Sequence, residues 1–152
     1  MKQHGFLPIL ILALSVLCMG LFSFSGNSGG DVFEIYLNGK QVHRQFVHID
    51  NSVKTLQLQT SGDNDKIEVF YSHCGVMGKN RVLTLRNEKN ELIKELKFPD
   101  VNNNRSVMGF YRRDVAKNMN TNLNLYYSSK ELPAGKLLAT IHWNEQKIIA
   151  KR

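Results

Sequence analysis

The chain has 152 residues and a formal net charge of +7, with 20 Lys and Arg residues against 13 Asp and Glu residues. This length indicates one domain. The basic residues are scattered and form no basic helix or dense run, which argues against a nucleic-acid-binding protein and favours solubility or contact with anionic surfaces.

The first 25 residues have the composition of an export signal. Lys2 is the only charged residue before Asp31, residues 6–22 are largely apolar, and small residues follow them. A positive start, an apolar middle and a small-residue exit describe a secretory signal. We expect a signal peptide over residues 1–25 and a secreted or periplasmic domain over residues 26–152. The apolar run also fits an uncleaved membrane anchor, which would leave the domain outside the cytoplasm as well.

The domain that follows the signal contains one cysteine. Cys18 lies within the expected signal, so Cys74 has no partner for an intramolecular disulfide. Small exported domains often depend on disulfides, but a chain of roughly 127 residues can bury enough apolar surface to fold without them. We therefore expect the fold to be stabilised by burial.

A β-hairpin is the clearest local prediction. Apolar residues alternate with polar ones over residues 32–37, Asn38-Gly39 follows, and residues 41–49 read as extended again. Asn-Gly between two such runs favours a type I′ turn, in which both central residues need a positive φ. The sequence therefore predicts a hairpin that turns at Asn38-Gly39.

The rest of the chain also reads as short extended segments separated by turns. Residues 92–98 could instead form a helix, and Asp114 could cap a single helical turn. Eight or nine short strands without a long helix predict an all-β fold, an antiparallel β-sandwich with an immunoglobulin-like architecture. The further expected strands cover residues 53–60, 66–74, 81–86, 92–98, 106–111, 122–128 and 136–143, with a final edge strand or a frayed end at 147–150.

Residues 71–81 contain the most unusual group of side chains. A reactive thiol needs a histidine within hydrogen-bond reach, but His73 and Cys74 are adjacent, and neighbours on a strand point to opposite faces. We expect Cys74 to be an ordinary thiol, buried or half-buried at the end of a strand. An accessible Cys74 close to His48 or His142 would instead favour an enzyme or a metal protein.

Other chemical sites are not indicated by the spacing. A blue-copper site needs a histidine soon after the cysteine, and no histidine lies between Cys74 and His142. The segment from Gly75 to Lys79 is too short for a phosphate-binding loop, and we expect its two glycines to have positive φ.

The charged residues indicate no catalytic site. We expect Lys79 and Arg81 to lie on a solvated rim, and the alternative is that they hold an anion beside the loop. A pair of carboxylates for glycoside hydrolysis is not indicated, because the candidate glutamates occupy positions that read as solvent-facing. These glutamates are Glu34, Glu68, Glu91 and Glu95.

Adjacent aromatic residues on a strand divide between its two faces, so one of Tyr126 and Tyr127 should be exposed. We expect these aromatics to pack in the core or the sheet, and the alternative is that an exposed tyrosine serves as a binding platform. We interpret the protein as a non-catalytic exported module that binds a protein or glycan partner, or that has a structural role in the cell envelope. The alternative is a small extracytoplasmic enzyme, or a redox or metal protein, that uses Cys74. We predict no catalytic residue, metal or cofactor, and the candidate binding residues are His73, Cys74, Lys79, Arg81 and Tyr127.

Overall fold

The computed structural model describes residues 30–100, 105–118 and 122–145. These form nine strands and one 3-10 helix, η2 (Arg112–Asn118), so the expected all-β fold is confirmed. The expected signal at 1–25 and the expected final strand at 147–150 lie outside the described residues. The strands are β1 (Val32–Leu37), β2 (Lys40–Phe46), β3 (Lys54–Thr60), β4 (Lys66–Ser72), β5 (Arg81–Arg86), β6 (Leu92–Phe98), β7 (Met108–Tyr111), β8 (Leu123–Ser128) and β9 (Lys136–Glu145).

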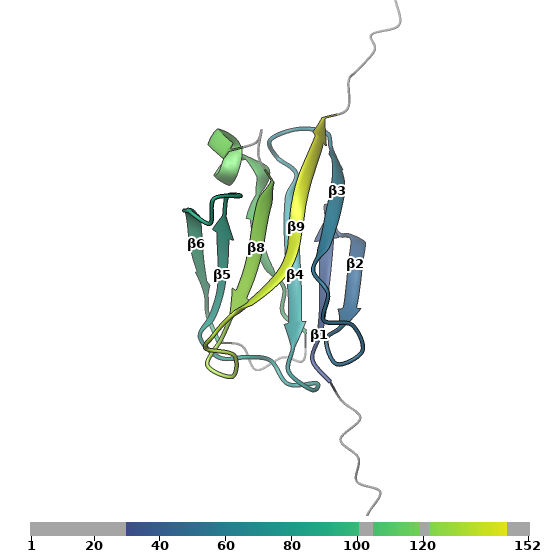
Figure 1. Ribbon diagram of the computed structural model, residues 1–152, viewed down its shortest axis with the longest axis vertical. Helices are drawn as coiled ribbons and strands as arrows, with labels where there is room; N and C mark the ends of the chain where they lie inside the picture. The colour runs from purple at the N-terminus through teal and green to yellow at the C-terminus, as the bar shows by residue number, and fades with distance from the viewer. Residues whose placement is uncertain (1–29, 101–104, 119–121, 146–152) are drawn as a thin grey trace, which may run out of the picture.

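The strands form two sheets, which lie face to face in Figure 1. One sheet has the order β2-β1-β4-β7 and the other has the order β3-β9-β8-β5-β6. The pairs are antiparallel except for β3 and β9, which run parallel from Lys54 beside Ala139 to Thr60 beside Glu145. The expectation of a wholly antiparallel fold is therefore wrong for the second sheet. The chain passes from β2 in one sheet to β3 in the other, where β3 joins a strand that comes much later in the sequence.

One hydrophobic core joins the two sheets. The alternation along each strand places every second side chain on the inner face, and fully burying one large aliphatic or aromatic side chain contributes about 1.5–3 kcal/mol. Fully buried core residues include Phe33, Ile35, Ile67, Val69, Leu83, Leu85, Leu125 and Ile141.

No helix among the described residues has the length and apolar character needed to cross a membrane.

The first hairpin is confirmed, with a shorter second arm than expected. Asn38 and Gly39 have φ of 52° and 78°, and Leu37 pairs directly with Lys40. The second arm ends at Phe46 and not at residue 49, because the chain turns there towards the other sheet. The buried side chain of Gln45 donates hydrogen bonds to the carbonyl oxygens of Asp50 and Ser52 and so holds this connection in place.

Replacing Gly39 tests the turn. A β-branched residue is strained at φ of 78°, so we expect Gly39→Val to lower the free energy of unfolding by about 1–3 kcal/mol. Gly62→Val is the matched control, because Gly62 has open space around it and no positive φ. Denaturant unfolding of both variants measures the difference. Equal stability of the two variants would show that the strain at residue 39 is absent.

Two local alternatives are decided by the fold. Residues 92–98 form a strand that pairs with β5, so the helical alternative is wrong there; the cross-strand pairing outweighs the helix preference of the glutamates and lysines. Asp114 lies at the third position of η2 and accepts a hydrogen bond from the backbone N–H of Tyr111 at 2.9 Å. Asp114 therefore caps the backbone that precedes η2 from a position inside this helix, and it is not the residue at which the helix begins.

Candidate functional site

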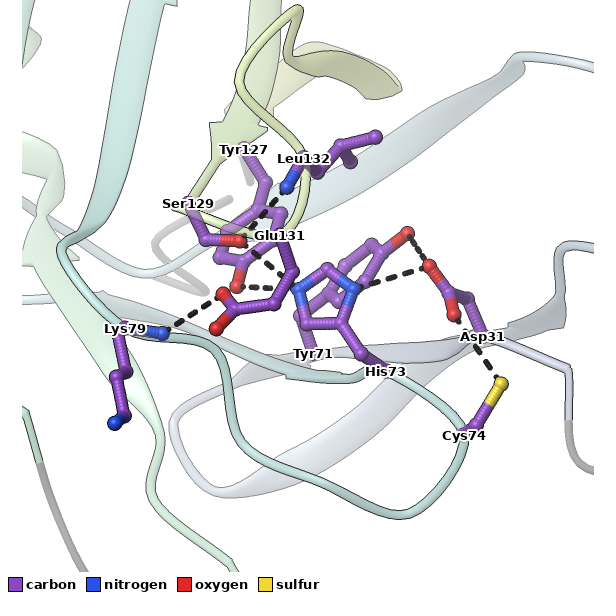
Figure 2. A network of polar contacts seen from close by, with 9 residues as sticks. All are labelled: Asp31, Tyr71, His73, Cys74, Lys79, Tyr127, Ser129, Glu131 and Leu132. Atoms are coloured by element: carbon purple, nitrogen blue, oxygen red, sulfur yellow. Dashed lines mark hydrogen bonds and ion pairs between the residues drawn. The ribbon is translucent and has the colours of Figure 1, made fainter.

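Three segments that are distant in sequence meet at the end of the molecule where β1 begins and β4 and β8 end (Figures 1 and 2). Asp31 lies just before β1, His73 just after β4, and Ser129 just after β8. His73 Nδ1 is 3.2 Å from Asp31 Oδ2. His73 Nε2 is 3.1 Å from both the Tyr127 hydroxyl and Ser129 Oγ. We call these four residues together with Tyr71 the His73 network.

The two tyrosines form the inner part of the network. Their rings stack with centroids 4.2 Å apart, and the Tyr71 hydroxyl donates to Asp31 Oδ2 at 2.8 Å. Burial raises the pKa of both phenols, and the hydrogen bond to Asp31 raises that of Tyr71 further. Both hydroxyls therefore stay protonated at physiological pH and remain able to donate hydrogen bonds.

Cys74 lies at the tip of a tight turn. His73 and Val76 exchange backbone hydrogen bonds of 2.8 and 2.9 Å, and the two residues between them have φ of 51° (Cys74) and 88° (Gly75). β4 has already ended at Ser72, so the alternation of faces no longer applies. The expected buried or half-buried thiol is thus wrong, because the turn leaves Cys74 exposed. Its Sγ is 3.9 Å from Asp31 Oδ1.

Gly78 is needed for close packing and not for its φ. Only Gly75 of the two expected positive-φ glycines has that conformation. A Cβ atom on Gly78 would clash with the Tyr127 hydroxyl and would lie 3.0 Å from His73 Nε2. The segment after Cys74 can therefore pass over the network only with glycine at this position.

Lys79 and Arg81 do not form the expected solvated rim. Lys79 is exposed and its backbone N–H donates to Glu131 (2.9 Å, Figure 2), whereas Arg81 is 1% exposed. Arg81 occupies the inward-facing phase of β5, and its guanidinium donates to the carbonyl oxygens of Pro99 (2.8 Å) and Ser106 (3.1 Å). Lys79 alone of the pair is therefore exposed, so the two residues do not share a solvated rim.

The alternative of Tyr127 as an exposed platform and the solvent-facing position expected for Glu34 are both wrong. Tyr127 is the inner member of the tyrosine pair and is completely buried, so it packs in the core and is no exposed platform. Glu34 is 4% exposed, because Arg105 and Arg44 pair with its carboxylate at 2.6 and 3.4 Å. A charged residue can take a buried position when such partners satisfy it.

The order of contacts from Asp31 through His73 to Ser129 resembles a hydrolytic triad. Ser129 is 6% exposed, however, and its Oγ accepts a hydrogen bond from the backbone of Leu132 at 3.2 Å. The Tyr127 hydroxyl also competes for His73 Nε2. The Ser129 hydroxyl is thus enclosed where a substrate would have to approach, and we interpret the network as a partly buried clamp that joins the ends of β1, β4 and β8.

Cys74 meets one of the two conditions for a catalytic or metal role, since it is accessible. His142 does not approach it, because its Nδ1 contacts Asn122 at the start of β8, at the opposite end of that strand. His48 packs against the backbone of Gly30, but the described contact to Cys74 Sγ comes from the carboxylate of Asp31. No group of three or more His, Cys, Asp or Glu residues within the described ranges is arranged to hold a metal ion.

Sequence reasoning found His73 and Tyr127 but missed Asp31, Tyr71 and Ser129. No local sequence pattern could relate these residues to His73, because Asp31 and Ser129 lie 42 and 56 residues from it in the chain. Only the packing of the two sheets brings them together.

A groove lies between β2 and β3, away from the His73 network. Its volume is about 730 Å³, and residues 55–59 line one side of it. Lys40 is the one charged residue in this lining, all of which the structure describes. The full lining is Leu37, Lys40, Gln41, Val42, Thr55, Leu56, Gln57, Leu58 and Gln59.

No model of a known protein family matches the chain, and no characterised protein shows significant similarity to its sequence.

Proposed function

We propose that this protein is an exported, non-catalytic β-sandwich module of immunoglobulin-like architecture that binds a protein or glycan partner through the groove between β2 and β3. Two sheets around one core support the sandwich architecture. The apolar, charge-poor start of the chain supports export. A structural role in the envelope would require no such groove.

The groove is the observation that carries this proposal. It combines apolar side chains such as Leu37 and Leu56 with amide side chains such as Gln41, a mixture suited to recognition. On the opposite side of the molecule an ion pair links β6 to η2, since Lys94 Nζ lies 3.2 Å from Asp114 Oδ1. The two sides therefore differ: one is linked by an ion pair, and the other presents a surface open to a partner.

The test is to capture envelope components with the protein purified in the form that is present in its own cells. We expect Val42→Glu, which adds a charge in the groove, to reduce the recovered partner at least tenfold. Leu92→Glu is the matched control, because Leu92 is also an exposed apolar residue on an edge strand but lies on β6, outside the groove. Equal recovery with both variants would refute the groove as the binding surface. Mass spectrometry of captured proteins and a glycan array identify the class of partner.

Export predicts a defined N-terminus. The protein purified from its own cells should begin near Gly26, or it should remain in the membrane fraction if the apolar run is retained as an anchor. N-terminal sequencing of each fraction measures this. Recovery of the full-length chain from the soluble cytoplasm would contradict export.

The enzyme alternative makes a separate prediction at Cys74. The polar contact of Cys74 Sγ is with the carboxylate of Asp31 and not with a histidine, so we expect slow alkylation by iodoacetamide at pH 6. We also expect Cys74→Ser to leave partner binding unchanged. Rapid alkylation at pH 6 together with loss of activity in the serine variant would support a reactive cysteine instead.

A further inference from the structure

The outer edges of β2 and β3 are both unpaired within the described residues, but they are protected differently. β2 carries a bulge, because its pairing with β1 shifts between Ile35 and Tyr36 and leaves Val42 without a partner. Bulges and charged residues discourage the pairing of an edge with another strand. β2 also has Lys40 and Arg44 along its length.

β3 has none of these protections along its central part. It is a seven-residue strand in unbroken register with β9, without proline or glycine. Its one charge, Lys54, lies at its first residue. A regular edge strand of this kind exposes a row of backbone donors and acceptors. The free edge of β3 is thus available for another strand.

Side chains beside this edge have the matching alternation. Leu58 is buried and Leu56 is half-buried, whereas Thr55, Gln57 and Gln59 are exposed. A strand added beside β3 would place every second side chain against the leucines and the others towards solvent. The lining of the groove therefore favours a segment in which apolar residues alternate with polar ones.

The charge of the groove selects further. Lys40 makes no ion pair with any carboxylate of the described residues, and no acidic residue belongs to the groove lining. Arg44 and Lys54, by contrast, are paired with Glu34 and Asp50. An acidic side chain on the partner would complement Lys40.

We infer that the free edge of β3 binds an extended segment of a partner protein by β-strand addition, a mode in which backbone hydrogen bonds supply affinity and alternate side chains supply specificity. The segment carries alternating apolar residues that contact Leu56 and an acidic residue that pairs with Lys40. This inference rests on the proposed function, because it names the partner of the same groove.

The probe is a random library of nine-residue peptides. The library is selected on the immobilised protein, purified in the form that is present in its own cells. We expect enriched peptides with apolar residues at every second position and an acidic residue. We expect Leu56→Lys, which directs a charge inward at the edge, to weaken binding at least tenfold. Leu92→Lys is the matched control, because it puts the same charge in place of a leucine on β6, the other edge of the same sheet and outside the groove, and should bind within twofold of the original protein. Lys40→Glu should remove the preference for an acidic residue.

Backbone methylation of one enriched peptide tests the pairing on the unaltered protein, so the result does not depend on the folding of Leu56→Lys. Only alternate amides of an added strand face β3. We therefore expect N-methylation at one set of alternate positions to weaken binding at least tenfold and at the other set to have little effect. Equal effects at both sets, or a library that yields no enriched peptide, would overturn strand addition. Glycan binding that Val42→Glu abolishes would preserve the proposed function and refute only this inference.

Discussion

Replacing Tyr127 with alanine is expected to lower the free energy of unfolding by about 3–5 kcal/mol, the usual cost of removing a large buried aromatic side chain. Tyr127 is completely buried, stacks on Tyr71 and reaches His73 with its hydroxyl. The variant would leave a cavity between the two sheets and would also remove a partner of His73 Nε2. Denaturant unfolding followed by fluorescence and circular dichroism measures the loss.

Two controls separate the causes. Tyr127→Phe keeps the stacked ring and removes only the hydroxyl, so it should cost about 0.5–1.5 kcal/mol, the net value of one hydrogen bond. Tyr126→Ala truncates the adjacent, half-buried tyrosine on the other face of β8 and should cost clearly less than Tyr127→Ala. If Tyr126→Ala and Tyr127→Ala were equally destabilising, the assignment of Tyr127 to the core would be wrong.

Asp65→Ala is the second substitution with a large expected effect. The Asp65 carboxylate is buried and accepts hydrogen bonds from Asn38 Nδ2 (2.8 Å), from the backbone and hydroxyl of Ser61 (2.6 and 2.8 Å) and from the backbone of Gly62 (3.2 Å). It thereby links the β1–β2 turn to the β3–β4 turn. Because hydrogen bonds to a charged group contribute about 1.5–3 kcal/mol each and overlap in one network, we expect a loss of about 2–4 kcal/mol at pH 7.

The pH dependence of this loss follows from the carboxyl group. Burial raises the pKa of Asp65, but the hydrogen bonds from Asn38, Ser61 and Gly62 outweigh burial and hold this pKa below its ordinary value. The stability that the carboxylate contributes is therefore complete above the unfolded pKa of about 3.9 and is lost as the pH falls through the lower, folded pKa. We expect the difference in unfolding free energy between the original protein and Asp65→Asn to shrink below about pH 4.

Measurements at pH 7 and pH 3 test this sign. Asp63→Ala serves as the control, because Asp63 lies in the same turn with a side chain that is 65% exposed and a 3.6 Å ion pair to Arg112. Because the carboxylate of Asp63 is largely in solvent, although Arg112 is only 6% exposed, we expect Asp63→Ala to cost clearly less than Asp65→Ala. A difference between the original protein and Asp65→Asn that grew on acidification would contradict the role assigned to Asp65.

Local patterns in the sequence were enough to predict much of the fold. The Asn38-Gly39 turn and the strands expected at residues 81–86 and 92–98 appear in the structure. Each depends on residues close together in the chain: a turn needs its own φ angles, and a strand repeats every two residues whatever it packs against. The all-β class, with eight or nine short strands, therefore followed from the sequence.

Only the tertiary structure decided which of these strands lie together and which charged residues they enclose. The parallel pairing of β3 with β9 and the contacts of His73 with Asp31 and Ser129 join segments far apart in the chain. Arg81 shows the same limit: its charge suggested solvent, but it lies in the interior and donates hydrogen bonds to the carbonyl groups of Pro99 and Ser106. A local pattern specifies the conformation of a segment, whereas its partners depend on how the whole chain packs to bury apolar surface and satisfy buried polar groups.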